Sequence, residues 1–258
     1  MHITADYHTH TLFSHGKNTI EENVQSALAK GLKTVCISEH ADGHRLYGVD
    51  KSRLLEIKQE ILRLRKKYPD IEICFGVEAN IVKEDGTLDV DGYDDIFDLL
   101  LVGMHFFVRF DRCFYYYIGN IFSRYLGLFC KYCRRRNTSI LLNCIKKYPH
   151  IFAITHPGER FFVDIDPLSK ECAKRGIALE INAGHGFMHA QDAAVAAANG
   201  AKIILSSDAH CAEDVGNMDI CIEIAKKANI PITQILNAEE SESHGVNHCH
   251  GHERSRKK

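Results

Sequence analysis

The sequence lacks the features that would place it in a membrane, secreted or strongly charged class of protein. Its 258 residues include 32 Lys and Arg against 34 Asp and Glu, and this near balance does not favour nucleic acid or an acidic membrane surface as a partner. No run of about 18 uncharged apolar residues is present, so we expect no membrane-spanning helix. There is also no N-terminal secretory signal, so we expect a cytoplasmic protein.

The cysteines do not have the spacing of a zinc finger. Ten are present, and without a secretory signal they indicate a reducing compartment rather than a framework of disulfides. Cys130 and Cys133 form one C-x-x-C pair inside a segment that we expect to be helical. No second pair accompanies them, so we interpret them as packing residues rather than metal ligands.

Short apolar runs alternate with segments of helical period along most of the chain. The runs are rich in β-branched residues, as is typical of strands that are buried on both faces of a parallel sheet. We expect strands at residues 3–7, 34–38, 71–76, 100–103, 152–155, 177–181 and 202–206. We expect helices at residues 20–30, 51–68, 167–175, 191–199 and 214–228. This order predicts an α/β fold with a parallel sheet, and seven units suit a barrel one unit short of eight.

Two segments depart from this alternation. Residues 106–148 form a long insertion that is rich in aromatic residues and then turns basic at 131–136, and we expect one or two helices near the barrel mouth. Residues 238–258 have no apolar periodicity, which predicts a disordered tail. We therefore expect one barrel domain over residues 1–237.

Side chains of the metal-ligand type follow six of the seven expected strands. They are His8, His10, His15, His40, Glu78, His105, His156, Asp208 and His210. The carboxyl ends of parallel strands in a barrel converge on one rim, so we expect these side chains to meet there. They are too many for one zinc ion and suit a cluster of two or three ions.

The ligand types indicate which chemistry such a cluster supports. Imidazoles and carboxylates suit zinc, which we expect first, and also manganese or iron(II). Glu78 stands among histidines, and a carboxylate is the group that bridges two ions most easily. Adjacent ions lower the pKa of a shared water, so we expect a metal-bridging hydroxide to attack a phosphate ester, and we assign no other catalytic residue. Asp6 and Glu39 adjoin ligand histidines and either orient them or act as caps.

Several other residues at the same rim are candidates for contact with a substrate. Arg160 follows the fifth strand and can clamp a phosphate with two hydrogen bonds. His44 and Arg45 lie on the loop after His40. The sixth strand supplies no expected ligand, but Asn182 and His185 at its end face the same rim.

The motifs taken together resemble the PHP (polymerase and histidinol phosphatase) superfamily, and most closely its stand-alone YcdX-like phosphatases. They lie at residues 6–11 (Asp-Tyr-His-Thr-His-Thr), 39–40 (Glu-His), 76–81 (Gly-Val-Glu-Ala-Asn-Ile), 103–105 (Gly-Met-His), 155–158 (Thr-His-Pro-Gly), 179–182 (Leu-Glu-Ile-Asn) and 206–210 (Ser-Ser-Asp-Ala-His). The resemblance covers the chain apart from the insertion and the tail. It implies a distorted (β/α)7 barrel of the PHP type with three divalent ions at the C-terminal rim.

The resemblance also distributes the nine positions among three ions. It implies that one ion is held by His8, His10, Glu78 and Asp208. Glu78 would bridge to a second ion that His105 and His156 also hold. The third ion would be held by His15, His40 and His210. All nine positions carry the residue types that the family uses.

The leading hypothesis is a metal-dependent phosphatase that hydrolyses small phosphomonoesters at a trinuclear site, with histidinol phosphate as one candidate substrate. One alternative is a PHP-type nuclease or phosphodiesterase that acts on nucleic-acid ends, although the low basicity counts against nucleic acid. Another is a catalytically silent metal-binding PHP module. The physiological substrate, the native metal, the general acid and the oligomeric state stay open.

Overall fold

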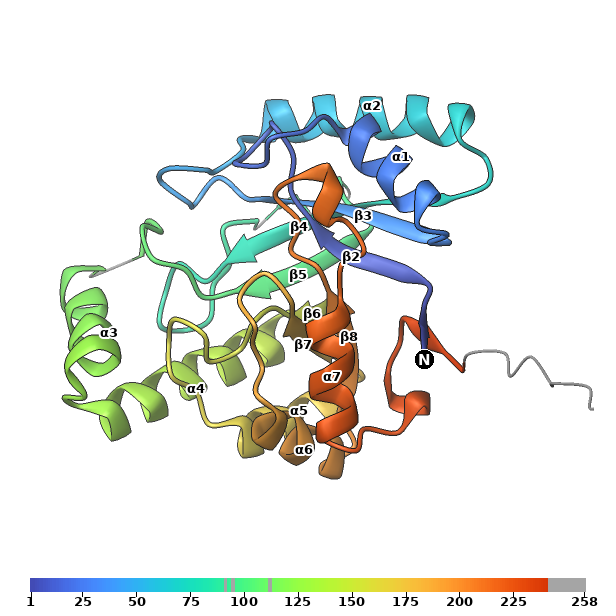
Figure 1. Ribbon diagram of the computed structural model, residues 1–258. Helices are drawn as coiled ribbons and strands as arrows, with labels where there is room; N and C mark the ends of the chain where they lie inside the picture. Colours follow the sequence, from blue (N-terminus) through green and yellow to red (C-terminus); the bar gives the residue numbers. More distant parts are fainter. Residues whose placement is uncertain (91, 94–95, 111–112, 241–258) are drawn as a thin grey trace, which may run out of the picture.

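A computed structural model describes residues 1–90, 92–93, 96–110 and 113–240 of the chain. Its centre is a sheet of seven parallel strands that follow one another in sequence order. The strands are β2 (Ala5–Thr9), β3 (Thr34–His40), β4 (Glu72–Asn80), β5 (Leu99–Gly103), β6 (Ile151–Ile154), β7 (Ala178–Asn182) and β8 (Lys202–Ser206). The sheet curves into a nearly closed barrel (Figure 1), because Thr9 and Ala209 form a parallel bridge between its two edges. The predicted α/β barrel of seven strands is confirmed.

Helices surround the barrel on its outer side. Figure 1 shows α1 (Ile20–Ala29) and α2 (Lys51–Lys67) over one side of the sheet, with α5 (Ile165–Arg175), α6 (Ala190–Ala198) and α7 (Asp219–Lys227) over the other. N-cap side chains accept hydrogen bonds from the free backbone N–H groups at the start of several of these helices. Thr19 and Glu22 form a reciprocal capping box at α1, and Asp50 accepts from the N–H of Arg53 at α2.

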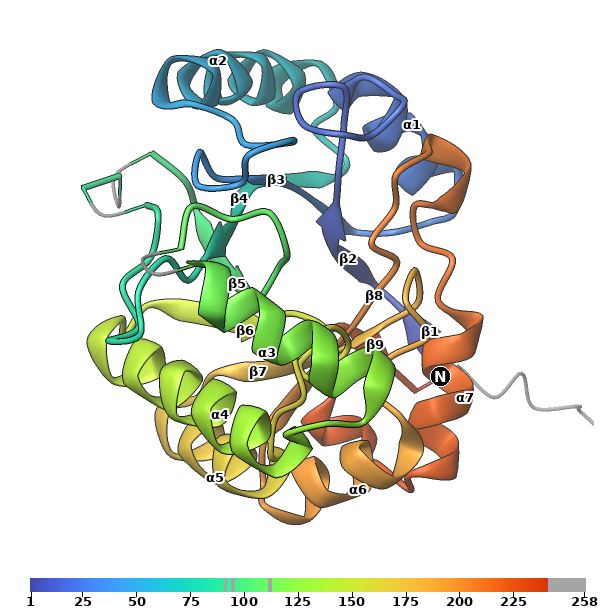
Figure 2. The same cartoon turned by 90° about the vertical axis from the view of Figure 1, so that its left-hand side faces the viewer.

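The insertion forms two helices, α3 (Cys113–Leu126) and α4 (Cys130–Lys147). Figure 2 shows them one above the other on the side of the barrel, and α4 packs against both α3 and α5. Within this pair the thiol of Cys130 donates to the carbonyl of Ser123, and the thiol of Cys133 donates to that of Gly119. The C-x-x-C pair therefore joins the two helices.

Strands β3 and β4 continue further than the apolar runs predict. His40 is the last residue of β3 and Glu78 lies within β4, where the two are register partners. His8 likewise lies inside β2. The sequence analysis places these three residues after the strands, but in the structure they belong to the strands. The strands extend through polar residues because the backbone groups are paired with neighbouring strands while the side chains meet a polar cavity.

The last helix begins later than predicted. The sequence pattern predicts helix from residue 214, but a 3-10 turn at Ala212–Asp214 is followed by a break, and α7 starts at Asp219. Gly216 in this break has a φ of 77°, and its N–H donates to the Asp6 carboxylate at 2.8 Å. A buried acceptor on β2 therefore competes with the helix for this backbone.

The predicted tail is ordered at its beginning. Ala238–Glu239 form a short strand, β9, that pairs antiparallel with β1 (His2–Ile3). The disorder prediction is therefore wrong for these two residues, whose backbone gains a partner from the N-terminus. Glu240 follows without regular structure, and residues 241–258 of the predicted tail lie outside the described residues.

Two further expectations concern cysteines and membranes. The described cysteines, which include Cys36, Cys74 and Cys221, are free thiols, in agreement with the expected absence of a disulfide framework in this part of the chain. Within residues 1–240, apart from the gaps noted above, no helix combines the length and apolar character needed to cross a bilayer.

One buried amide reinforces the seam between the first and last strands of the barrel. Asn237 is fully buried, and its side chain donates to the carbonyls of Ala5 and Leu205 at 2.7 and 2.6 Å. Its side-chain oxygen accepts from the N–H of Leu205 at 3.0 Å. The amide thus joins β2 to β8, where backbone pairing is sparse.

We predict that Asn237→Ala lowers the free energy of unfolding by about 2–4 kcal/mol, because it leaves buried backbone groups without partners. Urea denaturation followed by circular dichroism measures this loss. Asn143→Ala is the matched control, since the Asn143 amide makes one long bond to Glu84 near the surface, at 3.3 Å. The control should change stability by less than about 0.5 kcal/mol. Equal losses in the two variants would contradict this role for Asn237.

Candidate active site

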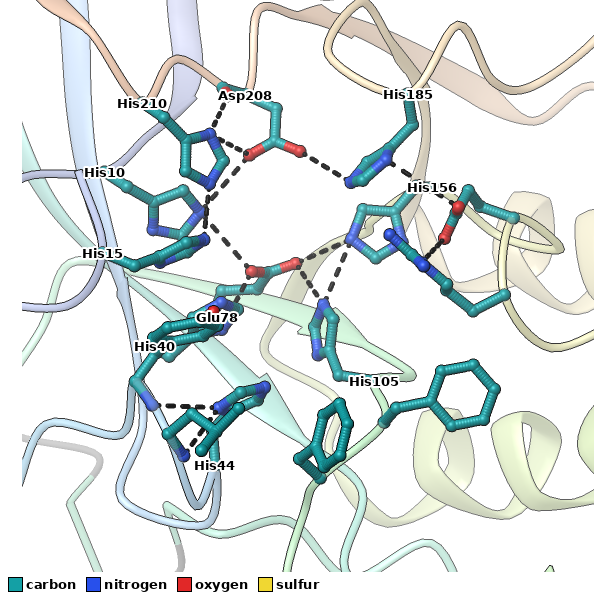
Figure 3. Close-up of a pocket in the computed structure, with 16 residues that line it drawn as sticks. His10, His15, His40, His44, Glu78, His105, His156, His185, Asp208 and His210 are labelled. Atoms are coloured by element: carbon teal, nitrogen blue, oxygen red, sulfur yellow. Dashed lines mark hydrogen bonds and ion pairs between the residues drawn. The ribbon is translucent and has the colours of Figure 1, made fainter. Parts of the chain in front are cut away.

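The predicted ligands surround one cavity at the carboxyl ends of the barrel strands. The cavity has a volume of about 360 Å³. Eight of the nine predicted ligands line it, and Figure 3 shows their side chains pointing toward one another. The ninth, His8, is fully buried, and its Nε2 atom lies 3.4 Å from Oε2 of Glu78. Side chains from distant parts of the sequence therefore converge as predicted.

Glu78 lies at the centre of this arrangement, with its two oxygens facing different imidazoles (Figure 3). Its Oε2 atom is 3.4 Å from Nε2 of His8 and 3.2 Å from Nδ1 of His40. Its Oε1 atom is 3.3 Å from Nε2 of His105 and 3.1 Å from Nε2 of His156. The carboxylate thus separates two groups of ring nitrogens and faces both.

Six of the histidines form three facing pairs. The Nε2 atoms are 3.1 Å apart in His8 and His10, and 3.2 Å apart in His105 and His156. In the third pair, His15 and His210, they are 2.5 Å apart. Two nitrogens bound tetrahedrally to one zinc ion are separated by about 3.3 Å, given bonds of about 2.0–2.1 Å. The spacing of the first two pairs is therefore close to that of ligands that share an ion.

Asp208 faces the first histidine pair from the opposite side to Glu78. Its Oδ1 atom is 3.4 Å from Nε2 of His10 and 3.5 Å from Nε2 of His8. Its Oδ2 atom accepts from the amide of Asn182 at 3.1 Å and lies 3.3 Å from Nε2 of His185. Asp208 has a φ of 54°, an uncommon value outside glycine that is found at functional sites.

Hydrogen bonds on the far side of several rings hold the imidazoles in place. Nδ1 of His8 is 2.7 Å from Oε1 of Glu180, and Nδ1 of His105 is 2.8 Å from the side-chain oxygen of Asn80. Nδ1 of His210 is 2.7 Å from the carbonyl of Asp208. When Nδ1 donates to these oxygens, the proton lies on that nitrogen and the Nε2 lone pair points toward the cavity.

Glu180 is the orienting carboxylate that the sequence pattern did not reveal. Besides His8, it accepts from the backbone N–H of His156 at 2.7 Å and from the amide of Asn182 at 3.0 Å. Its position inside a buried strand was the available signal, because a buried charge needs partners. The sequence pattern points to Asp6 and Glu39 for this role, with capping as the alternative.

Asp6 and Glu39 act mainly on the chain around the ligands. Asp6 accepts from the hydroxyl and N–H of Ser207 and from Gly216, and makes no contact with an imidazole among the described residues. Of the two roles expected for Asp6, the structure therefore favours capping, because its oxygens face backbone donors and a hydroxyl. Glu39 accepts from Thr11 and from Ser14, and its Oε2 lies 3.7 Å from Nδ1 of His10.

The predicted substrate residues are only partly brought together. Arg160, His44 and His185 line the cavity. Arg45 lies beside an adjoining groove instead, and Asn182 is fully buried with its amide bonded to Glu180 and Asp208. The structure therefore gives Asn182 a supporting contact with Asp208 and leaves it away from the cavity wall.

Some cavity residues had no signal in the sequence. Tyr47 stacks on His15 with ring centroids 4.5 Å apart, and Phe106 and Phe107 enter from the start of the insertion. Glu159 lies next to Arg160, and their side chains form an ion pair at 2.8 Å. None of these residues has a metal-ligand spacing or a recognisable motif, so only the tertiary structure reveals them.

The charges in the cavity determine the protonation of the free site. Burial alone lowers the pKa of His8, but the surrounding carboxylates, led by Glu78 and Asp208, raise it well above its usual value. Burial likewise lowers the pKa of His10, and contacts with Asp208 and Glu39 raise it to about 9. Burial raises the pKa of Glu78, but the nearby His105 and His8 hold it well below its usual value. Protons therefore provide the positive charge that buried carboxylates require.

The residues fit a group of divalent cations. Nδ1 of His10 and Nδ1 of His40 are buried and make no hydrogen bond within the described chain. Three sets of side chains have ligand atoms within 4.8 Å of one another: His10, His15 and His210; His8, His10 and Glu78; and His40, Glu78 and His105. Neutral imidazoles and carboxylates gathered at such distances are the donor set that zinc, manganese and iron(II) use.

Comparisons with known proteins agree with this geometry. The PHP domain family matches residues 6–184. The chain belongs to the PHP domain family. A probable phosphatase of Thermoanaerobacter sp. strain X514 is 30% identical over 251 residues, which cover 93% of this chain and 92% of the relative. The probable phosphatase YcdX of Shigella flexneri serotype 5b is 27% identical over 251 residues, covering 90% of this chain and 89% of the relative.

A solved structure shares the fold of this PHP chain. It is the histidinol phosphate phosphatase of Lactococcus lactis subsp. lactis, crystallised with zinc, L-histidinol and phosphate. The two structures superpose with a TM-score of 0.67 over 90% of this chain and 95% of the other, at 19% sequence identity. At this identity the likeness establishes the barrel fold of the PHP domain.

The raised pKa of His10 predicts a pH dependence for the metal-free protein. A histidine whose pKa rises from 6.5 to about 9 on folding stabilises the folded state while it is protonated. This contribution is complete below pH 6.5 and disappears as the pH rises through 9. We expect the contribution of His10 to the free energy of unfolding in EDTA to fall by roughly 2–3 kcal/mol over this range.

Urea denaturation at several pH values measures this decrease, and the variant His10→Asn should show a shallower one. A decrease in the wild type that is no steeper than in His10→Asn would contradict the assigned direction of the His10 shift.

Proposed function

We propose that this PHP chain is a metal-dependent phosphatase that hydrolyses small phosphomonoesters. The observation that carries the proposal is the position of Glu78, whose two oxygens face separate groups of buried imidazoles. A carboxylate in this position suits a bridge between two cations. The phosphatase relatives and the zinc in the Lactococcus structure support the same class of reaction.

The three facing histidine pairs support a trinuclear centre, for which zinc is the first candidate and manganese or iron(II) the others. We propose one ion on the pair His8 and His10, one on His105 and His156, and one on His15 and His210. Glu78 would bridge the first two and Asp208 would complete the first. His40 lies between the groups, with its ring centroid 4.9 Å from those of both His15 and His105.

When bound, such ions supply an activated water molecule and neutralise the charge of a phosphate. The protein fixes the orientation of His8 and His105 through hydrogen bonds from their Nδ1 atoms to Glu180 and Asn80. At the mouth, Arg160 is held by Glu159, and its guanidinium is available to a phosphate oxygen. His185 lines the cavity 3.3 Å from Asp208 and is our candidate for the ring that gives a proton to the leaving oxygen.

The alternatives fit the site less well. A nuclease requires a basic track leading to the cavity, yet Arg136 of the basic run is paired with Glu84, and Arg134 lies over the ring of Phe162. A cavity of about 360 Å³ suits a small ester better than a strand of nucleic acid. A silent metal-binding module is disfavoured because all nine family positions carry ligand types.

Replacing Glu78 tests the metal bridge. We expect Glu78→Gln to reduce kcat for p-nitrophenyl phosphate by about a thousandfold or more, because an amide does not bridge two cations and loses the negative charge. Elemental analysis should also find fewer than three ions per chain. Glu84→Gln, at an exposed position, is the control and should retain both. Wild-type turnover in Glu78→Gln would exclude the proposed bridge.

The type of ester separates the proposal from its alternatives. We expect the protein loaded with zinc or manganese to have a kcat/KM for p-nitrophenyl phosphate at least about a hundredfold higher than for bis(p-nitrophenyl) phosphate. This ratio corresponds to a difference in activation free energy of at least roughly 2.7 kcal/mol. EDTA should abolish the reaction and added metal should restore it. Preference for the diester would favour the nuclease, and full metal occupancy without turnover on either ester would favour the silent module.

A further inference from the structure

A second cavity, of about 440 Å³, adjoins the proposed active site. The two cavities share Phe106, Phe107 and Arg160 as walls. The remaining wall of the second cavity consists of Arg45, Val108, Tyr117, Ile121 and Tyr125. We name this cavity the α3 groove, because helix α3 supplies its outer side. Its lining is mainly apolar, in contrast to the histidines and carboxylates of the first cavity.

The inner wall of the α3 groove is held by hydrogen bonds between two loops. The N–H of Arg45 donates to the carbonyl of Phe107 at 2.8 Å, and His44 forms an antiparallel bridge with Val108. The hydroxyl of Tyr117 donates to the carbonyl of Val108 at 2.8 Å and so attaches α3 to the same segment. The loop that follows β3, which carries the metal-ligand candidate His40, is thereby tied to the groove.

Phe107 marks the boundary between the two cavities. Its φ of 62° is uncommon for a residue other than glycine, and its side chain is 60% exposed. Ile121 and Tyr125 on α3 are also largely exposed, at 40% and 66%. An unfavourable backbone conformation that holds an aromatic ring in solvent next to an active site is typical of a ligand-binding position.

The charge in the α3 groove is positive. Among the described residues that line it, Arg45 and Arg160 are the charged ones. Arg160 is paired with Glu159, whereas Arg45 forms no ion pair with any residue in the described part of the chain. A cationic group in the groove would therefore be repelled, and a neutral or anionic group would be favoured.

We propose that the α3 groove binds the organic part of the substrate, and that this part is an apolar group, such as an aromatic ring, that is neutral or negatively charged. This inference rests on the proposed phosphatase function, because it places the phosphate in the adjoining cavity. It also disfavours histidinol phosphate, since the amino group of histidinol is a cation at neutral pH. The substrate class is therefore a phosphomonoester whose alcohol is largely apolar and carries either no charge or a negative charge.

Benzyl phosphate and methyl phosphate test the groove, because their leaving alcohols have similar acidity and differ in the ring. We expect the metal-loaded wild type to have a kcat/KM at least about tenfold higher for benzyl phosphate, given the apolar area that the ring would bury. Ile121→Asp should reduce this benzyl-to-methyl ratio about tenfold, mainly through KM. Leu62→Asp is the matched control, because Leu62 is an exposed apolar residue on α2, and its ratio should equal that of the wild type.

A separate variant, Arg45→Glu, tests the effect of the positive charge in the α3 groove. Arg45→Glu should raise kcat/KM for histidinol phosphate relative to benzyl phosphate by about fivefold, because a carboxylate would replace the repelling cation. An unchanged ratio would overturn the charge requirement. Thermal melting of each variant checks that the fold is retained.

Binding of phosphonates separates the groove from the reaction. Calorimetry with benzylphosphonate and methylphosphonate, which are not hydrolysed, should show tighter binding of the benzyl compound to the wild type and the loss of this difference in Ile121→Asp. Equal binding of both compounds, with no effect of Ile121→Asp, would overturn the groove proposal even if hydrolysis occurs. Failure to hydrolyse any phosphomonoester would instead overturn the proposed function, while the binding difference would still decide the groove.

Discussion

The buried carboxylate of Glu78 and the imidazoles around it form the interaction on which the structure depends. A negative charge that is taken out of water is costly unless positive partners lie within a few ångströms. Here the partners come from four strands or the loops after them, so the charge is compensated only when the barrel is assembled. Without metal, the carboxylates raise the pKa of His8 and His156, so these two rings provide positive charge, whereas burial lowers the pKa of His40 and His105. Divalent cations can supply the positive charge at the same positions.

Different parts of the barrel support this centre in different ways. Apolar residues form the core between the strands and the helices, while the polar partners of the ligand rings lie at the rim. Glu180 and Asn80 restrain ligand rings from behind, and Asp6 restrains the chain that carries Asp208 through Ser207. Asn237 holds the barrel seam at a distance from the rim. A change at the seam should therefore act on stability, and a change behind the rings should act on metal affinity.

The residues proposed for the reaction and those proposed for substrate selectivity lie in separate parts of the same rim. The ligand histidines belong to the strands and the loops that directly follow them, whereas the α3 groove is built largely from the insertion. Phe107 belongs to both cavities, and Arg45 reaches the groove from the loop after β3. This division allows an insertion to change the shape and charge offered to the organic part of a substrate while the metal ligands stay in place.

The sequence by itself determined the parallel seven-stranded barrel and which residue types stand at the strand ends, because burial periodicity and ligand chemistry are local properties. That His8 and His156 share Glu180 as a partner, and that Asn182 turns inward while His185 lines the cavity, was decided only by the tertiary structure. The same holds for Arg45, which lies at the groove rather than the predicted cavity. These contacts join residues far apart in the chain, and their geometry depends on barrel closure and side-chain direction, which no local pattern encodes.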